Sequence, residues 1–234
     1  DCTGTLISPK HVLTTASFFV DEWGDAFWDY LYQTPESTLL TVDNSQVGLG
    51  LGLSKGIDIY IPDTYGPEYQ PTYKEYYSGN IAVVHIPALS DWGYDARYPS
   101  LPTCRSQVTN ANNTFVVGAG ESEDAGNAVR YAPYTIVGDL GVAPPGSTIE
   151  IESDHFTAES DAGASLCIGD HGAAMIELYS DGDSSSQDIL LGLNSWTSGW
   201  GCFDDGVAAY VDVLSHVNFI QDAMSGSIEP SIQM

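Results

Sequence analysis

The chain has 234 residues and 43% of them are hydrophobic, so it can bury the core of one large domain or two small ones. It carries 32 Asp and Glu against six Lys and Arg, a formal net charge of −26, and no Lys or Arg follows Arg130. A surface this negative repels nucleic acid and anionic lipid, and no apolar run approaches the roughly 20 residues of a membrane span, so neither nucleic acid nor a membrane is expected as a partner. The charge favours solubility, cation binding or a basic partner, and keeping an extracellular protein soluble would explain it without any partner.

Most of the chain is predicted to form short β-strands. Apolar or alternating runs are separated by Gly, Pro, Asn and Asp, a spacing typical of all-β barrels or sandwiches. In chain order, the expected strands are Gly4–Ile7, Val12–Thr14, Thr38–Val42, Ile57–Ile61, Ile81–Ile86, Thr114–Gly118, Ala132–Val137, Thr148–Ile151, Ala174–Leu178, Ile189–Leu193 and Val207–Tyr210.

One helix is expected close to the C-terminus, over Val211–Met224. Its apolar residues recur with the helical period and share one face, namely Val213, Val217, Ile220 and Met224. Residues Ser225–Met234 are expected to form a tail. Two stretches rich in aromatic and acidic residues, Asp21–Tyr32 and Tyr60–Tyr77, are expected to be long loops with embedded strand ends.

Cysteines and a sequon indicate the compartment. The four cysteines, Cys2, Cys104, Cys167 and Cys202, are widely spaced and none forms a C-x-x-C pair. This pattern argues against a zinc ribbon and fits disulfides formed in an oxidising compartment. Asn112 begins an Asn-Asn-Thr sequon, so it is a candidate for N-glycosylation. No metal or cofactor is expected, with calcium left open because the acidic residues could bind it although no motif indicates it.

Five segments occur in an order that matches a known family. Cys2–Phe18 contains C-T-G-T-L-I and V-L-T-T-A-S-F, and Gly79–Val84 reads G-N-I-A-V-V. Cys167–Ala174 reads C-I-G-D-H-G-A-A, Leu193–Cys202 contains N-S-W and G-C, and Gly206–Tyr210 precedes the expected helix. They resemble the segments C-G-G-T-L-I…V-L-T-A-A-H-C, N-D-I-A-L-L, C-x-G-D-S-G-G-P, V-S-W-G…G-C and G-V-Y of the chymotrypsin-type serine proteases, the trypsin family. The resemblance covers nearly the whole chain.

The resemblance implies an all-β fold of two six-stranded antiparallel β-barrels with a C-terminal helix. The expected boundaries are residues 1–103 for the N-terminal barrel, 104–210 for the C-terminal barrel, 211–224 for the helix and 225–234 for the tail. The family's first strand is missing from the N-terminal barrel and no signal peptide is present. We therefore expect that a preceding segment was trimmed or left out.

The positions of the family's catalytic triad carry other residues. Where the family has His, Asp and Ser, this chain has Ser17, Asn80 and His171. Acyl transfer needs a nucleophile, an imidazole base and an orienting carboxylate, and losing any one of them removes most of the rate. Ser17 and His171 are formally exchanged, but a hydroxyl on the opposite wall approaches the carbonyl wrongly relative to the oxyanion donors. The resemblance therefore predicts no enzyme and no catalytic residue.

The cysteines follow the family only in part. The resemblance implies a disulfide between Cys167 and Cys202 that braces the substrate pocket. The family partner of Cys2 is replaced by Phe18. Cys2 is therefore expected to be free, to pair with Cys104, or to pair with a segment outside this chain.

The substrate pocket is expected to persist as a vestige. The resemblance places Ser165, Ser195, Trp196 and Gly206 in its walls, and no acid at its base. Asp170 is retained, although the chain lacks the Ile-Val-Gly-Gly start whose ammonium group pairs with this residue in the family. Partner contacts are expected instead in the two aromatic loops, at Trp23, Trp28, Tyr65 and Tyr69, because Tyr and Trp are enriched at interfaces.

The favoured function is that of a secreted, extracellular pseudoprotease that binds a protein. Inactive homologues of the family include inhibitors of secreted hydrolases, among them the glucanase-inhibitor proteins of plant-pathogenic microbes. We therefore expect an inhibitor or decoy of a secreted hydrolase, with a partner that is basic or bridged by a cation. The alternative is a structural subunit of an extracellular matrix, sheath or filament, in which the partner is another copy of the chain. An active enzyme is the least favoured hypothesis.

Overall fold

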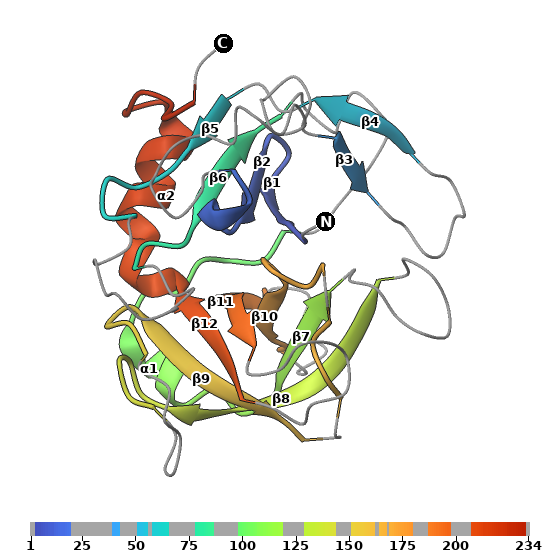
Figure 1. Cartoon of the computed structure of the whole chain (residues 1–234), viewed down its shortest axis with the longest axis vertical. Coiled ribbons are helices and arrows are strands. Elements are labelled where there is room, and N and C mark those ends of the chain that lie inside the picture. Colours follow the sequence, from blue (N-terminus) through green and yellow to red (C-terminus); the bar gives the residue numbers. More distant parts are fainter. Residues whose placement is uncertain are drawn as a thin grey trace, which may run out of the picture.

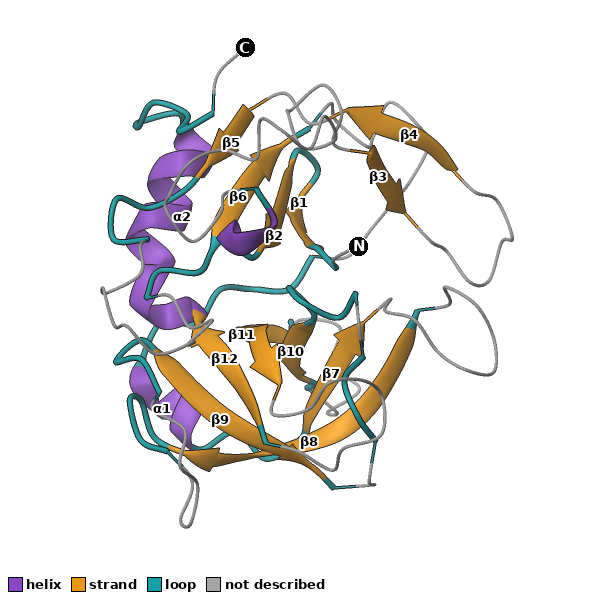
Figure 2. Cartoon of the chain, viewed as in Figure 1, coloured by secondary structure: helices purple, strands orange, loops and turns teal. Residues whose placement is uncertain are grey.

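The computed structural model describes residues 3–19, 39–42, 51–55, 58–65, 78–86, 98–118, 129–143, 151–161, 164–167, 169–179, 187–197 and 207–232. Its described elements are mainly antiparallel strands, arranged in two halves that meet along a shared core (Figure 1). The expectation of an all-β fold with a C-terminal helix is confirmed (Figure 2).

The C-terminal half is a closed six-stranded barrel. Its strands are hydrogen-bonded in the order β10-β11-β12-β9-β8-β7, each antiparallel to its neighbours. They are β7 (Thr114–Gly118), β8 (Arg130–Gly138), β9 (His155–Ser160), β10 (Ala174–Glu177), β11 (Ile189–Thr197) and β12 (Ala208–Asp212). This barrel matches the second of the two that the sequence predicts.

The N-terminal half also contains six strands, but the described residues place them in two sheets. A four-stranded sheet has the order β1-β2-β6-β5, and β3 pairs with β4 separately. The strands are β1 (Thr5–Ser8), β2 (His11–Thr14), β3 (Leu39–Val42), β4 (Leu51–Lys55), β5 (Asp58–Tyr60) and β6 (Ala82–His85). Closure of a first barrel therefore stays a prediction.

One hydrophobic cluster joins the two halves. Leu13 and Val83 of the N-terminal sheet pack with Leu190 and Val211 of the barrel, and all four are fully buried. Burying one such side chain contributes roughly 1.5–3 kcal/mol, so this shared core holds the halves against each other.

The C-terminal helix begins later than the sequence predicts. A short 3₁₀ helix, η3 (Val213–His216), precedes α2 (Val217–Ser225). The first two residues of the expected helix belong to β12, because β12 pairs with β11 as far as Asp212. The Asp212 side chain then accepts the Ser215 N–H and caps η3. The other described helices are the 3₁₀ helix η1 (Ala16–Phe18) and α1 (Arg105–Thr109).

The residues expected to form a tail fold back instead onto β5. α2 ends at Gly226, whose φ of 70° is left-handed, and the chain then returns to the N-terminal sheet. The Ser231 N–H donates to the Ile59 carbonyl at 2.9 Å, and the Ile61 N–H donates to the Ser231 hydroxyl at 2.8 Å. Ile232 is only 7% exposed. The segment thus covers the edge of β5, whose backbone groups would otherwise lack partners.

Candidate functional site

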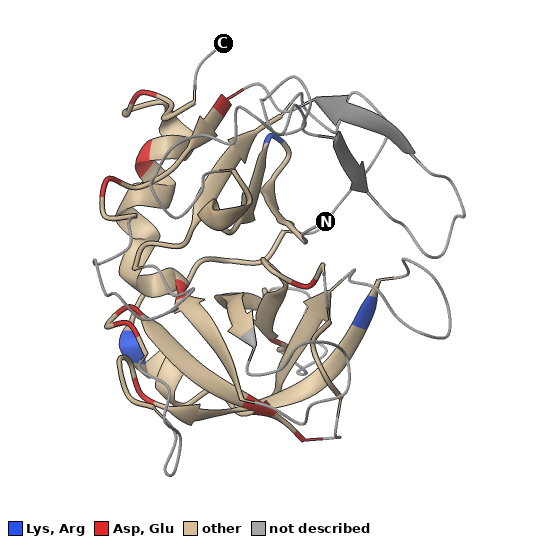
Figure 3. Ribbon diagram, viewed as in Figure 1, with Lys and Arg blue, Asp and Glu red and all other residues tan. Residues whose placement is uncertain are grey.

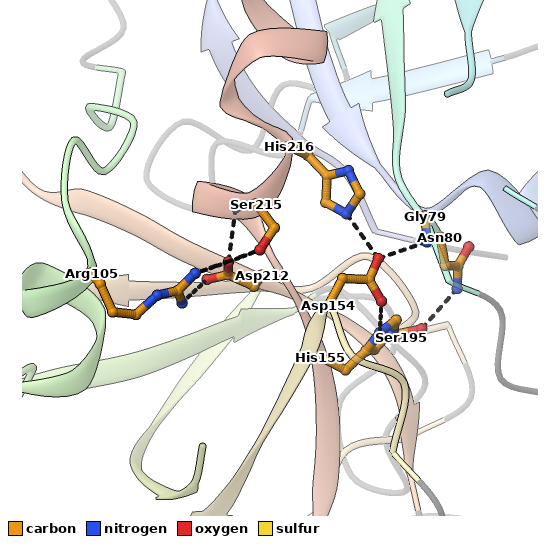
Figure 4. Close-up of polar contacts among 9 residues, drawn as sticks. All are labelled: Gly79, Asn80, Arg105, Asp154, His155, Ser195, Asp212, Ser215 and His216. Atoms are coloured by element: carbon orange, nitrogen blue, oxygen red, sulfur yellow. Dashed lines mark hydrogen bonds and ion pairs between the residues drawn. The ribbon is translucent and has the colours of Figure 1, made fainter. Parts of the chain in front are cut away.

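The two halves are joined by a buried asparagine. Asn80 lies just before β6 and is 1% exposed. Its Oδ1 accepts the backbone N–H of Ser17 at 2.9 Å. Its Nδ2 donates to the hydroxyl of Ser195 on β11 at 2.8 Å (Figure 4). The structure therefore brings together three residues that the sequence singles out, two from the triad positions and one from the pocket wall.

The chemistry of this contact depends on the amide. An amide offers an acceptor and a donor at once, and Asn80 uses both to hold its neighbours. An ionised carboxylate only accepts, so the hydroxyl of Ser195 would have to turn and donate to it. Asn80 is therefore a bridge between the halves with both functional atoms occupied, and it carries no charge that could stabilise an imidazolium.

A second buried bridge lies beside the first. Asp154, just before β9, accepts the backbone N–H of Gly79 at 2.7 Å, and its carboxylate contacts His155 Nδ1 at 2.8 Å and His216 Nε2 at 2.9 Å (Figure 4). Burial raises the pKa of Asp154, but the hydrogen bonds from His155, His216 and Gly79 outweigh burial and hold this pKa far below its ordinary value. Asp154 thus remains an anion that links the N-terminal half to the barrel and to η3.

Gly79 has to be glycine at this bridge. Its φ is +69°, in the left-handed region, and a Cβ would lie 2.9 Å from the hydroxyl of Thr64. Since Gly79 and Asn80 are consecutive, one tight turn delivers both inter-half contacts.

Sequence reasoning missed the Asp154 cluster. No motif links Asp154 and His155 to His216, which lies far along the chain and reaches them only because β12 and η3 follow β9 in space. The one available signal was the rarity of histidine, of which the chain has five.

His171 lies on the loop that leads into β10, and it is exposed. Its carbonyl accepts the Thr3 N–H at 2.7 Å, and the Thr3 hydroxyl donates to the Gly169 carbonyl at 2.9 Å. Gly172, with φ +83°, follows; a Cβ there would overlap the carbonyl of Thr3. The N-terminal segment is therefore packed directly on the loop that carries His171.

Asp170 is buried in the barrel. Its carboxylate accepts the Cys167 N–H at 2.8 Å and lies so close to Gly118 that a Cβ there would overlap it. Burial, with a smaller contribution from Asp170, raises the pKa of Tyr134 to about 12. Of the expected pocket walls, Ser195 is buried, Ser165 and Trp196 are half-buried, and Gly206 lies outside the described residues.

The cysteines settle one of the open alternatives. Cys167 is disulfide-bonded, and Cys104 is free and exposed. Pairing of Cys2 with Cys104 is therefore wrong in this structure. Cys2 and Cys202 lie outside the described residues, so the bond between Cys167 and Cys202 stays a prediction.

The remaining expected contacts are only partly visible. Trp23, Trp28 and Tyr69 lie outside the described residues. Tyr65 is half-buried, packs against a core cluster and donates its N–H to the Pro62 carbonyl at 2.8 Å. Asn112 is exposed just before β7, and its glycosylation stays a prediction.

Within the described ranges, no group of three or more His, Cys, Asp or Glu side chains is arranged to hold a metal ion. None of the helices in the described part of the chain is long and apolar enough to span a bilayer.

Sequence comparison identifies relatives that are named as inhibitor proteins. The chain is 26% identical over 229 residues to glucanase inhibitor protein 1 of Phytophthora infestans, covering 94% of this chain and 76% of that protein. It is 24% identical over 230 residues to glucanase inhibitor protein 1 of Phytophthora sojae, covering 95% and 78%. Both of these relatives are named as inhibitors of glucanases.

Structural comparison and a family profile agree with the fold. HL collagenase, solved at 1.7 Å, aligns with a TM-score of 0.64 at 20% identity, covering 97% of this chain and 87% of the collagenase, which shows the fold. The profile of the family described as Trypsin matches residues 1–220. The chain is therefore a member of the trypsin family.

Proposed function

We propose that this chain is a secreted, non-catalytic trypsin-family protein that binds and inhibits a hydrolase, with a glucanase as the first candidate. The observation that carries the proposal is the state of Asn80. At the position of the family's orienting carboxylate stands a neutral amide whose two polar atoms already hold Ser17 and Ser195. The names of the relatives supply the class of partner.

The triad chemistry fails at each position. Ser17 replaces the imidazole base, so no group there takes a proton at neutral pH. Asn80 cannot offset the charge of an imidazolium. His171 replaces the nucleophile on the loop that packs against Thr3, and an imidazole there forms no acyl intermediate comparable to a serine ester. Binding energy is then available for recognition without turnover.

The acidic surface favours a basic or cation-bridged partner. In the described part of the chain, Asp and Glu occur along the ribbon of both halves, and few Lys and Arg accompany them (Figure 3). Such a field accelerates encounter with a positively charged surface. We place the main contacts in the aromatic loops, at Trp23, Trp28, Tyr65 and Tyr69, and not at the vestigial pocket.

Inhibition of a purified glucanase tests the proposal. We expect activity to fall as the chain is added and the loss to saturate near one chain per enzyme, with a complex visible by light scattering. Replacing Trp23 or Trp28 by Ala should weaken inhibition, while His171→Ala, the matched control on the old active site, should leave it nearly unchanged. If His171→Ala alone abolishes inhibition, the contact surface has been misplaced.

A second function is favoured by one observation. Cys104 is an exposed, free thiol, which would suit covalent assembly of a structural subunit in an oxidising compartment. A homopolymer that dissociates on reduction, in place of a monomer that complexes an enzyme, would support this alternative.

A further inference from the structure

Three polar residues form a row across three neighbouring strands of the N-terminal sheet. His11 of β2 is directly opposite His85 of β6, and His85 is directly opposite Asp58 of β5. Directly opposed residues project from the same face of a sheet, so the two imidazoles and the carboxylate lie side by side. This row lies far along the sheet from Asn80 and belongs to neither inter-half bridge.

The row borders the hydrophobic core. Two residues further along each strand, and on the same face of the sheet, Leu13 lies opposite Val83 and Val83 lies opposite Tyr60. All three belong to the shared core cluster. The side chains of His85 and Asp58 are each 30% exposed, and His11 is half-buried. The row is thus accessible to a small solute while one of its sides is held by packed side chains.

The two imidazole rings are stacked, and each has an oxygen atom near its Nδ1; only His11 is hydrogen-bonded to it. Their centroids are 5.1 Å apart with 18° between the planes. His11 Nδ1 lies 2.7 Å from the Ser8 hydroxyl, and His85 Nδ1 lies 3.5 Å from Asp58 Oδ2. Neither Nε2 atom has a partner among the described residues. Tautomers with the proton on Nδ1 therefore leave two Nε2 lone pairs available on adjacent rings.

This arrangement is the one found around metal-binding histidines. A ligating imidazole usually donates its other N–H to a carboxylate or another oxygen, which fixes the ring and raises its basicity. Imidazole nitrogens are preferred by Zn²⁺, Cu²⁺ and Ni²⁺. Metal–nitrogen bonds of about 2.0–2.1 Å require the two nitrogens to approach to roughly 3.4 Å in a tetrahedral site, so the stacked rings would tilt toward each other.

Charge favours a cation at the row. The formal charge of −26 raises the local concentration of divalent cations. Of the charged neighbours described, Asp58 lies beside His85 and favours a cation, whereas Lys10 lies beside His11 and opposes one.

We propose that His11 and His85 together bind one divalent transition-metal ion, Cu²⁺ or Zn²⁺, through their Nε2 atoms. Ser8 and Asp58 orient the rings, and water completes the coordination. With two protein ligands the site is open on one side, where a further donor from a partner protein can be added. This inference does not depend on hydrolase binding.

Nuclear magnetic resonance on the unaltered protein tests the site directly. The chain has five histidines, so their imidazole C–H signals can be followed individually. Substoichiometric Cu²⁺, added with excess Ca²⁺ to occupy carboxylate sites, should broaden the signals of His11 and His85 before the other three. Broadening that starts at exposed His171, or equally at all five, would overturn the proposal.

Calorimetric titration with Zn²⁺ and Cu²⁺ then measures affinity. We expect one ion per chain. Asp58→Asn should lower the affinity for the ion roughly 10- to 100-fold. His11→Asn and His85→Asn should each lower it more. Matched controls are His171→Asn, an exposed histidine elsewhere, and Asp63→Asn, an exposed carboxylate just beyond β5; neither should change affinity. Unchanged binding in both His11→Asn and His85→Asn would place the ion elsewhere and reject the site.

Discussion

Asn80 and Ser195 lie in opposite halves of the molecule, and a hydrogen bond of 2.8 Å joins the amide Nδ2 of one to the hydroxyl of the other. They are 1% and 3% exposed, so water does not substitute for either partner. Because Asn80 also holds the Ser17 backbone, a single side chain fixes η1, β6 and β11 relative to one another.

Removing the Asn80 side chain should destabilise the fold. Asn80→Ala leaves the Ser195 hydroxyl without its donor and the Ser17 N–H without its acceptor, and we expect a loss of about 1–3 kcal/mol in the free energy of unfolding. Asn80→Asp is the matched control, since it keeps an acceptor for Ser17 and lets Ser195 donate. Urea unfolding at neutral pH should rank Asn80→Asp above Asn80→Ala; equal losses would show that the hydrogen bonds are unimportant.

Asp154 should make the protein sensitive to strong acid. Its folded-state pKa is lowered from the ordinary value of 3.8, so the folded state binds fewer protons than the unfolded state. The stability it contributes is present above that value and is lost as the pH falls below it. Asp154→Asn should be less stable than the parent at pH 7, and the difference should shrink on acidification below about pH 4. A difference that does not change with pH would contradict this assignment.

His11 should control a separate pH window. Its pKa is about 4 in the folded protein against 6.5 ordinarily, so the unfolded state binds the extra proton between these values. The contribution of His11 to the free energy of unfolding is therefore fully present above pH 6.5 and is lost as the pH falls toward 4. In metal-free protein, His11→Gln should flatten the stability profile between those values, whereas exposed His171→Gln should not. Parallel profiles for parent and His11→Gln would argue against the shift.

The returning C-terminal segment should contribute to stability. Ile232 is buried against Ile59 of β5 and the neighbouring core, so Ile232→Ala should cost about 2 kcal/mol, near the lower end for buried isoleucines. Gln221→Ala, on the exposed side of α2, serves as the control and should change little. Thermal unfolding of the three proteins checks this, and a parent-like melting temperature for Ile232→Ala would mean that the segment is not held in solution.

The elements that the sequence predicts best are those with strong apolar patterns. β7 is predicted with its observed bounds, and three of the four residues of the expected helical face contact the core, since Val213 of η3 and Ile220 of α2 are buried in it and Met224 packs against it. β9 was missed because Phe156 is the only large apolar residue in His155–Ser160, and the polar residues His155 and Thr157 are nevertheless buried. His155 contacts Asp154 and the Ser160 hydroxyl accepts the Ala164 N–H, and no local pattern reveals either partner.

The contacts of the candidate site were also predictable only in part. Asn80 and Ser195 could be found because they lie in segments that resemble a family, and the structure brings them into contact. The Asp154–His216 contact and the His11–His85 pair depend on strand order and register, which the sequence does not display. The contacts that depend on long-range strand pairing are therefore the ones that the sequence could not predict.

Labelling by a fluorophosphonate probe, followed by intact-mass measurement, tests the absence of serine-hydrolase chemistry most directly. Such probes react with a serine activated by a neighbouring base, and trypsin in the same experiment is the positive control. Because Ser17, Asn80 and His171 are predicted at the triad positions, the chain should keep its unmodified mass under conditions that label trypsin completely. Stoichiometric labelling at any serine of this chain would contradict the account.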